Sequence, residues 1–196
     1  MRRWYRKGRP APTPPAVKRL LLETYATTYR CPIFIETGTH EGETPYFLRN
    51  HFEQLFTIEL SPEFFERAKK KLSPFTHIKQ LQGDSGERLG EILATVDRPC
   101  MFWLDGHYSG GITAKGEKFC PLLEELSHIW RHPIKQHVIL LDDARCFGKK
   151  EDYPRVEELV ELGRKAGYDW EMHYDIFCLT PAGVGKLGAQ LKKMIE

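Results

Sequence analysis

The sequence has no apolar run that approaches the roughly 20 residues needed to span a membrane as a helix, so it contains no predicted transmembrane segment. It has five cysteines, at positions 31, 100, 120, 146 and 178, and no CxxC pair among them. An odd number of unpaired cysteines indicates buried, reduced thiols. The basic, proline-rich start has no apolar stretch behind it, unlike a secretory signal. We therefore expect a cytoplasmic protein.

Acidic residues are missing from the start of the chain, where the first one is Glu23. Seven basic residues precede it, and the remainder then has 22 basic and 27 acidic residues. Such a segment can contact phosphates or an anionic membrane, or it can be a solvated arm that ends in the prolines of residues 10–15. We expect the second: a basic, proline-rich flexible arm over residues 1–15, a single domain over residues 16–196, and no nucleic acid partner. The seven basic residues are Arg2, Arg3, Arg6, Lys7, Arg9, Lys18 and Arg19.

A short apolar run that leads into two glycines is the most informative stretch of the chain. Residues 32–35 (PIFI) are too few for a helix and apolar enough for a buried parallel strand. Gly38 and Gly42 allow a tight turn and a close approach of the backbone to a ligand. Residues 44–52 can then form a helix whose first N–H groups face the same point. Strand, glycine turn and helix form the entrance to the nucleotide site of doubly wound α/β folds.

The rest of the chain alternates between strand and helix patterns. A helix over 16–29 comes first, and helices over 62–72 and 85–96, with Ser61 and Ser85 as their N-caps, follow strands over 55–60 and 78–84. Strands over 100–104 and 137–141 enclose a helix that begins at residue 121, and a further helix covers 153–166. Residues 170–173 and 176–180 are joined by too short a turn for a parallel crossover. The pattern predicts one Rossmann-like doubly wound sheet of parallel strands with an antiparallel hairpin at the carboxyl end.

Each of the five predicted parallel strands has an acidic side chain at its carboxyl end or directly after it. Each acid alone could be a loop carboxylate or a helix cap. Because ligands of open α/β sheets bind beyond the carboxyl ends of the strands, we expect these acids to share one site. The acid after the second strand lies 21 positions after Gly38 and can accept hydrogen bonds from both hydroxyls of a ribose. The acids are Glu36, Glu59, Asp84, Asp105, Asp142 and Asp143.

The pattern E-x-G-x-x-x-G of residues 36–42 resembles motif I of the class I S-adenosylmethionine-dependent methyltransferases, and the final antiparallel strand resembles the ending of that fold. The resemblance implies S-adenosylmethionine as cofactor. It places Asp84 beside the adenine and Glu59 beside the ribose. The cofactor-binding residues that it implies are Glu36, Gly38, Thr39, His40, Gly42, Glu59, Leu60, Asp84, Ser85 and Asp105.

Residues 103–111 and 140–145 are similar to the metal-assisted O-methyltransferases of the catechol and macrocin types. This resemblance implies that Asp105, Asp142 and Asp143 bind a divalent ion, and carboxylates suit Mg²⁺ or Mn²⁺. The catechol type has Asp-Asn where this chain has Asp143 and Ala144, whereas the two adjacent acids of the macrocin type fit better. Alternatively, the acids cap the next helix or hold Arg145.

His107, in the glycine-rich segment after the fourth strand, is the candidate general base, because an imidazole can take the proton of an acceptor hydroxyl. It could equally be a surface residue or a metal ligand. Asp105 is the second candidate catalytic residue. We expect methyl transfer from S-adenosylmethionine to a hydroxyl of a small molecule or sugar. The oligomeric state is not determined by the sequence, and a homodimer is one alternative. A nicotinamide dehydrogenase is disfavoured by the missing middle glycine of GxGxxG. A non-catalytic nucleotide-binding module is disfavoured by the acids after the fourth and fifth strands.

Overall fold

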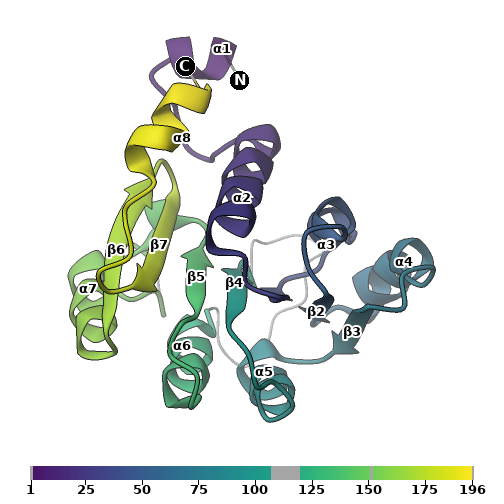
Figure 1. Cartoon of the computed structure of the whole chain (residues 1–196). Coiled ribbons are helices and arrows are strands. Elements are labelled where there is room, and N and C mark those ends of the chain that lie inside the picture. The colour runs from purple at the N-terminus through teal and green to yellow at the C-terminus, as the bar shows by residue number, and fades with distance from the viewer. Residues whose placement is uncertain (1, 107–119, 151, 196) are drawn as a thin grey trace.

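The computed structural model of the chain describes residues 2–106, 120–150 and 152–195. Seven strands form one sheet with the order β3-β2-β1-β4-β5-β7-β6 (Figure 1). Strands β1 to β5 are parallel, and β7 runs antiparallel to both β5 and β6. This arrangement confirms the predicted fold. The strands are β1 (Ile33–Thr37), β2 (Gln54–Glu59), β3 (Ile78–Gln82), β4 (Cys100–Leu104), β5 (Val138–Leu141), β6 (Tyr168–His173) and β7 (Ile176–Pro181).

Helices cover both faces of this sheet (Figure 1). One core lies between the sheet and α2, α3 and α8, and the other lies between the sheet and α5, α6 and α7. Helix α4 packs beside β2 and β3. None of the helices in the described ranges is long and apolar enough to cross a membrane. The helices are α1 (Arg2–Arg6), α2 (Pro15–Tyr29), α3 (Glu43–Leu48), α4 (Pro62–Leu72), α5 (Ser85–Leu93), α6 (Leu122–Arg131), η1 (Ala144–Cys146), α7 (Val156–Lys165) and α8 (Gly188–Ile195).

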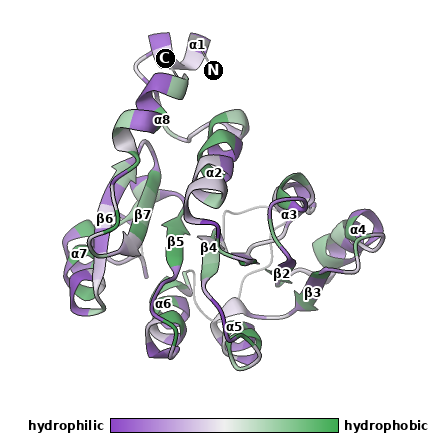
Figure 2. Ribbon diagram, viewed as in Figure 1, coloured by the Kyte–Doolittle hydropathy of each residue, from purple (hydrophilic) through white to green (hydrophobic). Residues whose placement is uncertain are grey.

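The central strands are apolar on both sides, as expected for parallel strands with helices on each face. Phe34 and Trp103 contact the core under α2, whereas Ile35 and Phe102 contact the core over α5 and α6. All four side chains are nearly inaccessible to solvent. In Figure 2 the strands β4, β5 and β7 are green, which marks hydrophobic residues, and the surrounding helices carry both hydrophobic and hydrophilic residues.

Of the two predicted serine N-caps, the structure confirms one and corrects the other. Ser61 caps α4 as expected, because its hydroxyl accepts a hydrogen bond of 3.4 Å from the N–H of Phe64. The prediction that Ser85 caps α5 is wrong: Asp84 is the N-cap, and its Oδ1 accepts a hydrogen bond of 2.8 Å from the N–H of Gly86. A carboxylate is as good an N-cap as a serine hydroxyl, and it interacts more favourably with the helix dipole.

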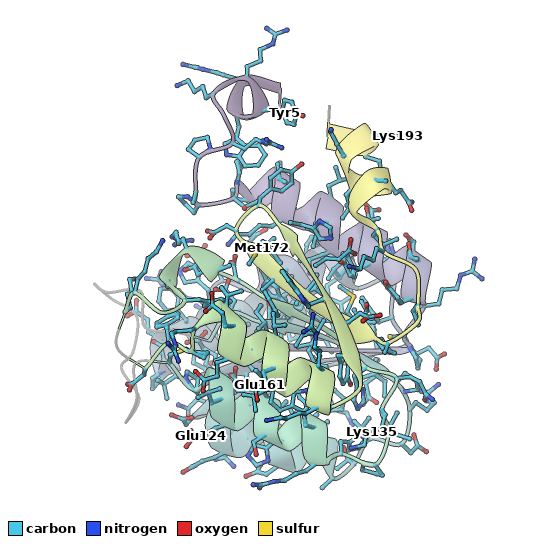
Figure 3. All side chains as sticks on the ribbon, turned by 90° about the vertical axis from the view of Figure 1, so that its left-hand side faces the viewer. Tyr5, Glu124, Lys135, Glu161, Met172 and Lys193 are labelled. Carbon is cyan, nitrogen blue, oxygen red and sulfur yellow. The ribbon has the colours of Figure 1, made fainter. Side chains whose placement is uncertain are left out.

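The amino-terminal segment contacts the carboxyl-terminal part of the fold. The ring centroids of Trp4 and Tyr174 are 5.0 Å apart, and the guanidinium of Arg9 lies 5.8 Å from the Tyr174 ring centroid. Figure 3 shows Tyr5 on α1 and Lys193 on α8 at the same end of the molecule. Thr13, assigned to the arm in the prediction, is 2% exposed. That part of the segment is therefore packed onto the domain, while the mobility of residues 2–12 stays a prediction.

Candidate active site

The turn after β1 needs glycine at its first position. Gly38 has a φ of +83°, and a Cβ built on it would lie 2.5 Å from the backbone oxygen of Asp105. That contact is far too short for real atoms, so the ends of β1 and β4 can touch only because residue 38 has no side chain. The N–H of Gly38 donates a hydrogen bond of 2.9 Å to the carbonyl of Ile58. Gly38 thus joins the ends of three adjacent strands.

The register of the sheet places four of the predicted site residues in one row. Thr37 lies opposite both Ile58 and Leu104, and Leu104 lies opposite Leu141. The next residue along each of these strands belongs to the predicted site. Neighbouring strands are about 4.8 Å apart, so the row extends across the carboxyl edge of the sheet. In spatial order its members are Glu59, Gly38, Asp105 and Asp142.

Glu59 ends β2 with a carboxylate that the backbone holds in place. Its Oε2 accepts a hydrogen bond of 2.7 Å from the N–H of His40, and its Oε1 accepts one of 2.8 Å from the N–H of Ser61. The residue is 7% exposed. Each carboxylate oxygen has two lone pairs, so the arrangement leaves capacity to accept hydrogen bonds from a bound ligand.

Glu36 is the penultimate residue of β1, two positions before Gly38, and is 1% exposed. Its Oε2 accepts a hydrogen bond of 2.9 Å from the hydroxyl of Thr57, whose Oγ1 lies 2.5 Å from Oγ1 of Thr39. Burial raises the pKa of Glu36 to about 8, and the charge of Glu59 acts in the same direction, while hydrogen bonds from Thr57 and Thr44 oppose the shift. Through Thr57, the Glu36 side chain is linked to Thr39 in the glycine turn.

The remaining residues predicted around the adenine and the turn lie at the same edge of the sheet. Asp84 is half-buried at the start of α5, and Ser85 is buried as its first residue. The carbonyl of Leu60 accepts a hydrogen bond of 3.0 Å from the side-chain amide of Gln82. The rings of His40 and Phe64 are in contact, with 4.1 Å between their centroids and an angle of 36° between their planes. Gly42 adopts a φ of +71° as the N-cap of α3.

A cluster of buried acids lies at the ends of β5 and β7. Carboxylate oxygens of Asp142, Asp143 and Asp175 lie within 4.8 Å of one another. Asp142 and Asp143 were predicted here from the sequence, whereas Asp175 was not. All three are at most 7% exposed. Desolvated like charges at this separation need compensation.

Two cations of the chain provide that compensation. The Lys18 ammonium pairs with Oδ2 of Asp142, and the Arg145 guanidinium pairs with both Asp143 and Asp175. Burial lowers the pKa of Lys18, but the charges of Asp105, Asp142 and Asp143 raise it, and the net shift is upward. Lys18 is therefore an ammonium at neutral pH.

These contacts bear directly on the predicted divalent ion. The donor set suits a hard cation by its chemistry, but each acid of the cluster already pairs with Lys18 or Arg145. An ion would have to displace both side chains, so the residues as arranged do not fit one. A metal requirement stays a prediction from the resemblance. Within the described part of the chain, Oδ1 of Asp142 and Oγ1 of Thr37 are buried polar atoms without a hydrogen-bond partner.

His107, the predicted base, lies outside the described residues. Two residues of the site, Lys18 and Asp175, were not predicted from the sequence. Lys18 was counted with the basic arm, although its charge lies within the predicted helix over 16–29. Asp175 stands in the turn of the predicted hairpin, and nothing in its spacing relates it to the end of β5. No spacing in the sequence distinguishes Lys18 from the other basic residues as the partner of Asp142.

The chain was compared with known proteins. No protein-family model and no curated protein matches it. Among solved structures, an O-methyltransferase from Bacillus cereus in complex with SAH matches with a TM-score of 0.62 at 15% identity, over 87% of this chain and 84% of that one. The O-methyltransferase TomG from Streptomyces achromogenes, in complex with SAM, matches with a TM-score of 0.58 at 19% identity, over 91% and 86%.

A third structure, a putative caffeoyl-CoA O-methyltransferase from Staphylococcus aureus, has a TM-score of 0.57 at 12% identity, over 91% of this chain and 90% of that one. At these identities the matches establish the fold. Together with the strand order and the antiparallel β7, they show that the chain has the class I methyltransferase fold.

Proposed function

We propose that the chain is an S-adenosylmethionine-dependent methyltransferase that methylates a hydroxyl group of a small molecule or sugar. The observation that carries this proposal is the row formed by Glu59, Gly38, Asp105 and Asp142 along the carboxyl edge of the sheet. In this row the buried carboxylate of Glu59 lies on one side of Gly38, and Asp105 and Asp142 lie on the other side. Because Gly38 has no side chain, a ligand can approach the backbone closely there.

Each part of the row has a role in the proposal. Glu59 would accept hydrogen bonds from the ribose hydroxyls, and Asp84 with Ser85 and Leu60 would border the adenine. The turn formed by Gly38, Thr39, His40 and Gly42, supported by Glu36, would hold the amino-acid part of the cofactor. The lack of a side chain at Gly38 and the buried hydroxyl of Thr37, which has no partner among the described residues, are compatible with a ligand close to this turn.

When bound, S-adenosylmethionine supplies the methyl group on a positively charged sulfur. The protein has to hold the acceptor oxygen in line with that methyl group and remove the hydroxyl proton. We assign proton removal to His107 and the orientation of the acceptor to Asp105. Alignment alone accounts for a large part of the rate in such displacements.

Transfer of a labelled methyl group from S-adenosylmethionine to a panel of hydroxyl compounds, including catechols and sugars, tests the proposal. We expect label in an ether product from at least one class of acceptor. A chain that binds S-adenosylhomocysteine but labels only amines or thiols would contradict O-methylation. A chain that binds NAD and does not bind S-adenosylhomocysteine would contradict the whole assignment.

A further inference from the structure

The three acids that resemble a metal-ligand set interact with an ammonium group of the chain itself. Lys18 pairs with Asp142 and interacts electrostatically with both Asp105 and Asp143. These are the same three residues that the resemblance assigns to a divalent ion. A positive charge among them is expected on physical grounds, because converging buried carboxylates repel one another. In this chain the charge comes from α2.

The position of Lys18 is fixed by the packing of its helix. Val17 and Leu21, its neighbours on α2, are 0% exposed in the core. Just before the helix, the hydroxyl of Thr13 accepts a hydrogen bond of 3.2 Å from the N–H of Asp175. The side chain of Lys18 is 22% exposed, and its Nζ lies 5.8 Å from the centroid of the Trp103 ring. The buried neighbours on α2 fix the backbone of Lys18, and the contacts with Asp142 and Trp103 fix its ammonium group.

Arg145 completes the compensation on the far side. Its guanidinium pairs with Oδ1 of Asp143 and with Oδ2 of Asp175. Its backbone N–H also donates a hydrogen bond of 2.7 Å to Oδ1 of Asp175. Charge-assisted hydrogen bonds of this kind are about twice as strong as neutral ones. The cluster is therefore held together by side chains of the chain itself.

We propose that Lys18 is the resident cation of this site, and that it takes the place of the divalent ion that the metal-assisted O-methyltransferases use. The inference rests on the proposed methyl transfer. Lys18 is a positioning residue: its ammonium keeps Asp105, Asp142 and Asp143 together at the edge of the sheet. Its charge also favours a hydroxyl oxygen that is losing its proton.

The reaction balances without a metal ion. The bond between the methyl carbon and the donor sulfur breaks, and the sulfur keeps the electron pair. A bond forms between the methyl carbon and the acceptor oxygen, whose proton passes to a general base. The ammonium of Lys18 keeps its own proton throughout.

Electron paramagnetic resonance of Mn²⁺, together with methyl transfer in EDTA, tests this inference. We expect the wild-type chain to leave the spectrum of free Mn²⁺ unchanged and to keep full activity in EDTA. Lys18→Met leaves Asp105 and Asp142 without this cation, while Arg145 still pairs with Asp143. Mn²⁺ can then bind at the first two acids without displacing Arg145, so the variant should gain an Mn²⁺ signal that wild type lacks. Its methyl transfer in EDTA should fall by at least about tenfold. Lys18→Arg should restore metal-free transfer. Arg19→Met, which removes an exposed cation from the same helix, serves as the matched control and should behave as wild type.

The inference is overturned if wild-type protein binds Mn²⁺ tightly or loses its activity in EDTA. It is also overturned if Lys18→Met keeps wild-type activity in EDTA and gains no Mn²⁺ signal. The wild-type measurements need no variant, so a failure of Lys18→Met to fold would not remove the test. Titration with S-adenosylhomocysteine is run in parallel: without such binding the proposed function fails, while the Mn²⁺ spectrum still decides the role of Lys18.

Discussion

The backbone N–H of His40 donates a hydrogen bond of 2.7 Å to Oε2 of Glu59. This contact ties the glycine turn after β1 to the carboxylate that ends β2. The hydrogen bond from Ser61 to the other oxygen of Glu59 fixes the same side chain from the start of α4. A carboxylate held in this way has little conformational freedom left to lose when a ligand binds, which favours affinity.

Gly38→Ala should be much more destabilising than the same change at Gly183. Both glycines have a positive φ, of +83° and +81°, but an added Cβ meets Asp105 at 2.5 Å at the first position and nothing within 4 Å at the second. We expect Gly183→Ala to cost about 1 kcal/mol from backbone strain and Gly38→Ala about 3 kcal/mol or more. Denaturant unfolding measures both. Equal losses would show that the ends of β1 and β4 are not in contact.

Stability should fall on acidification because of His137. This residue is 0% exposed, and burial, with smaller contributions from the charges of His132 and Lys135, lowers its pKa to about 4 from 6.5. Between these values the unfolded chain binds a proton that the folded chain does not, so stability is complete above pH 6.5 and is lost as the pH falls towards 4. The loss from pH 7 to pH 5 should be about 2 kcal/mol for this group.

The variant His137→Asn provides the check on that assignment. His137 accepts a hydrogen bond of 3.0 Å from the N–H of Cys100 and lies 3.0 Å from the ring of His132, so the variant is less stable at pH 7. The variant lacks the titrating group, so its free energy of unfolding should not show this loss. The difference in free energy of unfolding between wild type and variant should therefore be about 2 kcal/mol smaller at pH 5 than at pH 7. A deficit that is the same at both pH values would assign the acid sensitivity to another group.

His107→Ala should reduce turnover by roughly 10² to 10⁴ and leave the affinity for S-adenosylmethionine nearly unchanged. This is the behaviour expected when a general base is lost and the cofactor site stays intact. Steady-state kinetics and a parallel cofactor titration measure the two quantities. A variant with wild-type turnover would exclude His107 as the base.

Deletion of residues 1–12 should lower the melting temperature by only a few degrees. The deletion removes the Trp4–Tyr174 ring pair and keeps the buried Thr13. An aromatic pair contributes about 0.5 to 1.5 kcal/mol beyond its buried area, which corresponds to about 1 to 6 °C for a chain of this size. A larger fall in a thermal scan would show that the segment is an integral part of the domain.

Sequence patterns were sufficient for the sheet, because each of its features has a local cause. Alternating apolar runs and the Ser61 cap of α4 set the elements, and the short turn before Ile176 forces the antiparallel strand. The acids at the strand ends were found for the same reason. Lys18 was missed because its role depends on a contact with Asp142, more than 100 residues away in the chain. Asp175 was missed because its role depends on a contact with Arg145, which lies in a different segment. Such contacts leave no periodic signal in the sequence.

The balance of charges in the site could not be read from the acids alone. The sequence offered two partners for Asp105, Asp142 and Asp143: a divalent ion, or Arg145 of the chain itself. Arg145 does pair with Asp143, and Lys18, which the sequence did not indicate, pairs with Asp142. The predicted base His107 lies outside the described residues, so its role remains to be tested by kinetics.

Calorimetric titration with S-adenosylhomocysteine, compared between wild type and Glu59→Ala, tests the central claim most directly. Hydrogen bonds to a charged group contribute roughly 1.5 to 3 kcal/mol each, so loss of the Glu59 carboxylate should weaken binding at least about tenfold. Glu63→Ala, which removes an exposed carboxylate from the nearby helix α4, should bind as wild type does. We predict that wild type binds S-adenosylhomocysteine saturably and does not bind NAD. Binding of NAD with no response to S-adenosylhomocysteine, or equal affinity in wild type and Glu59→Ala, would contradict the account.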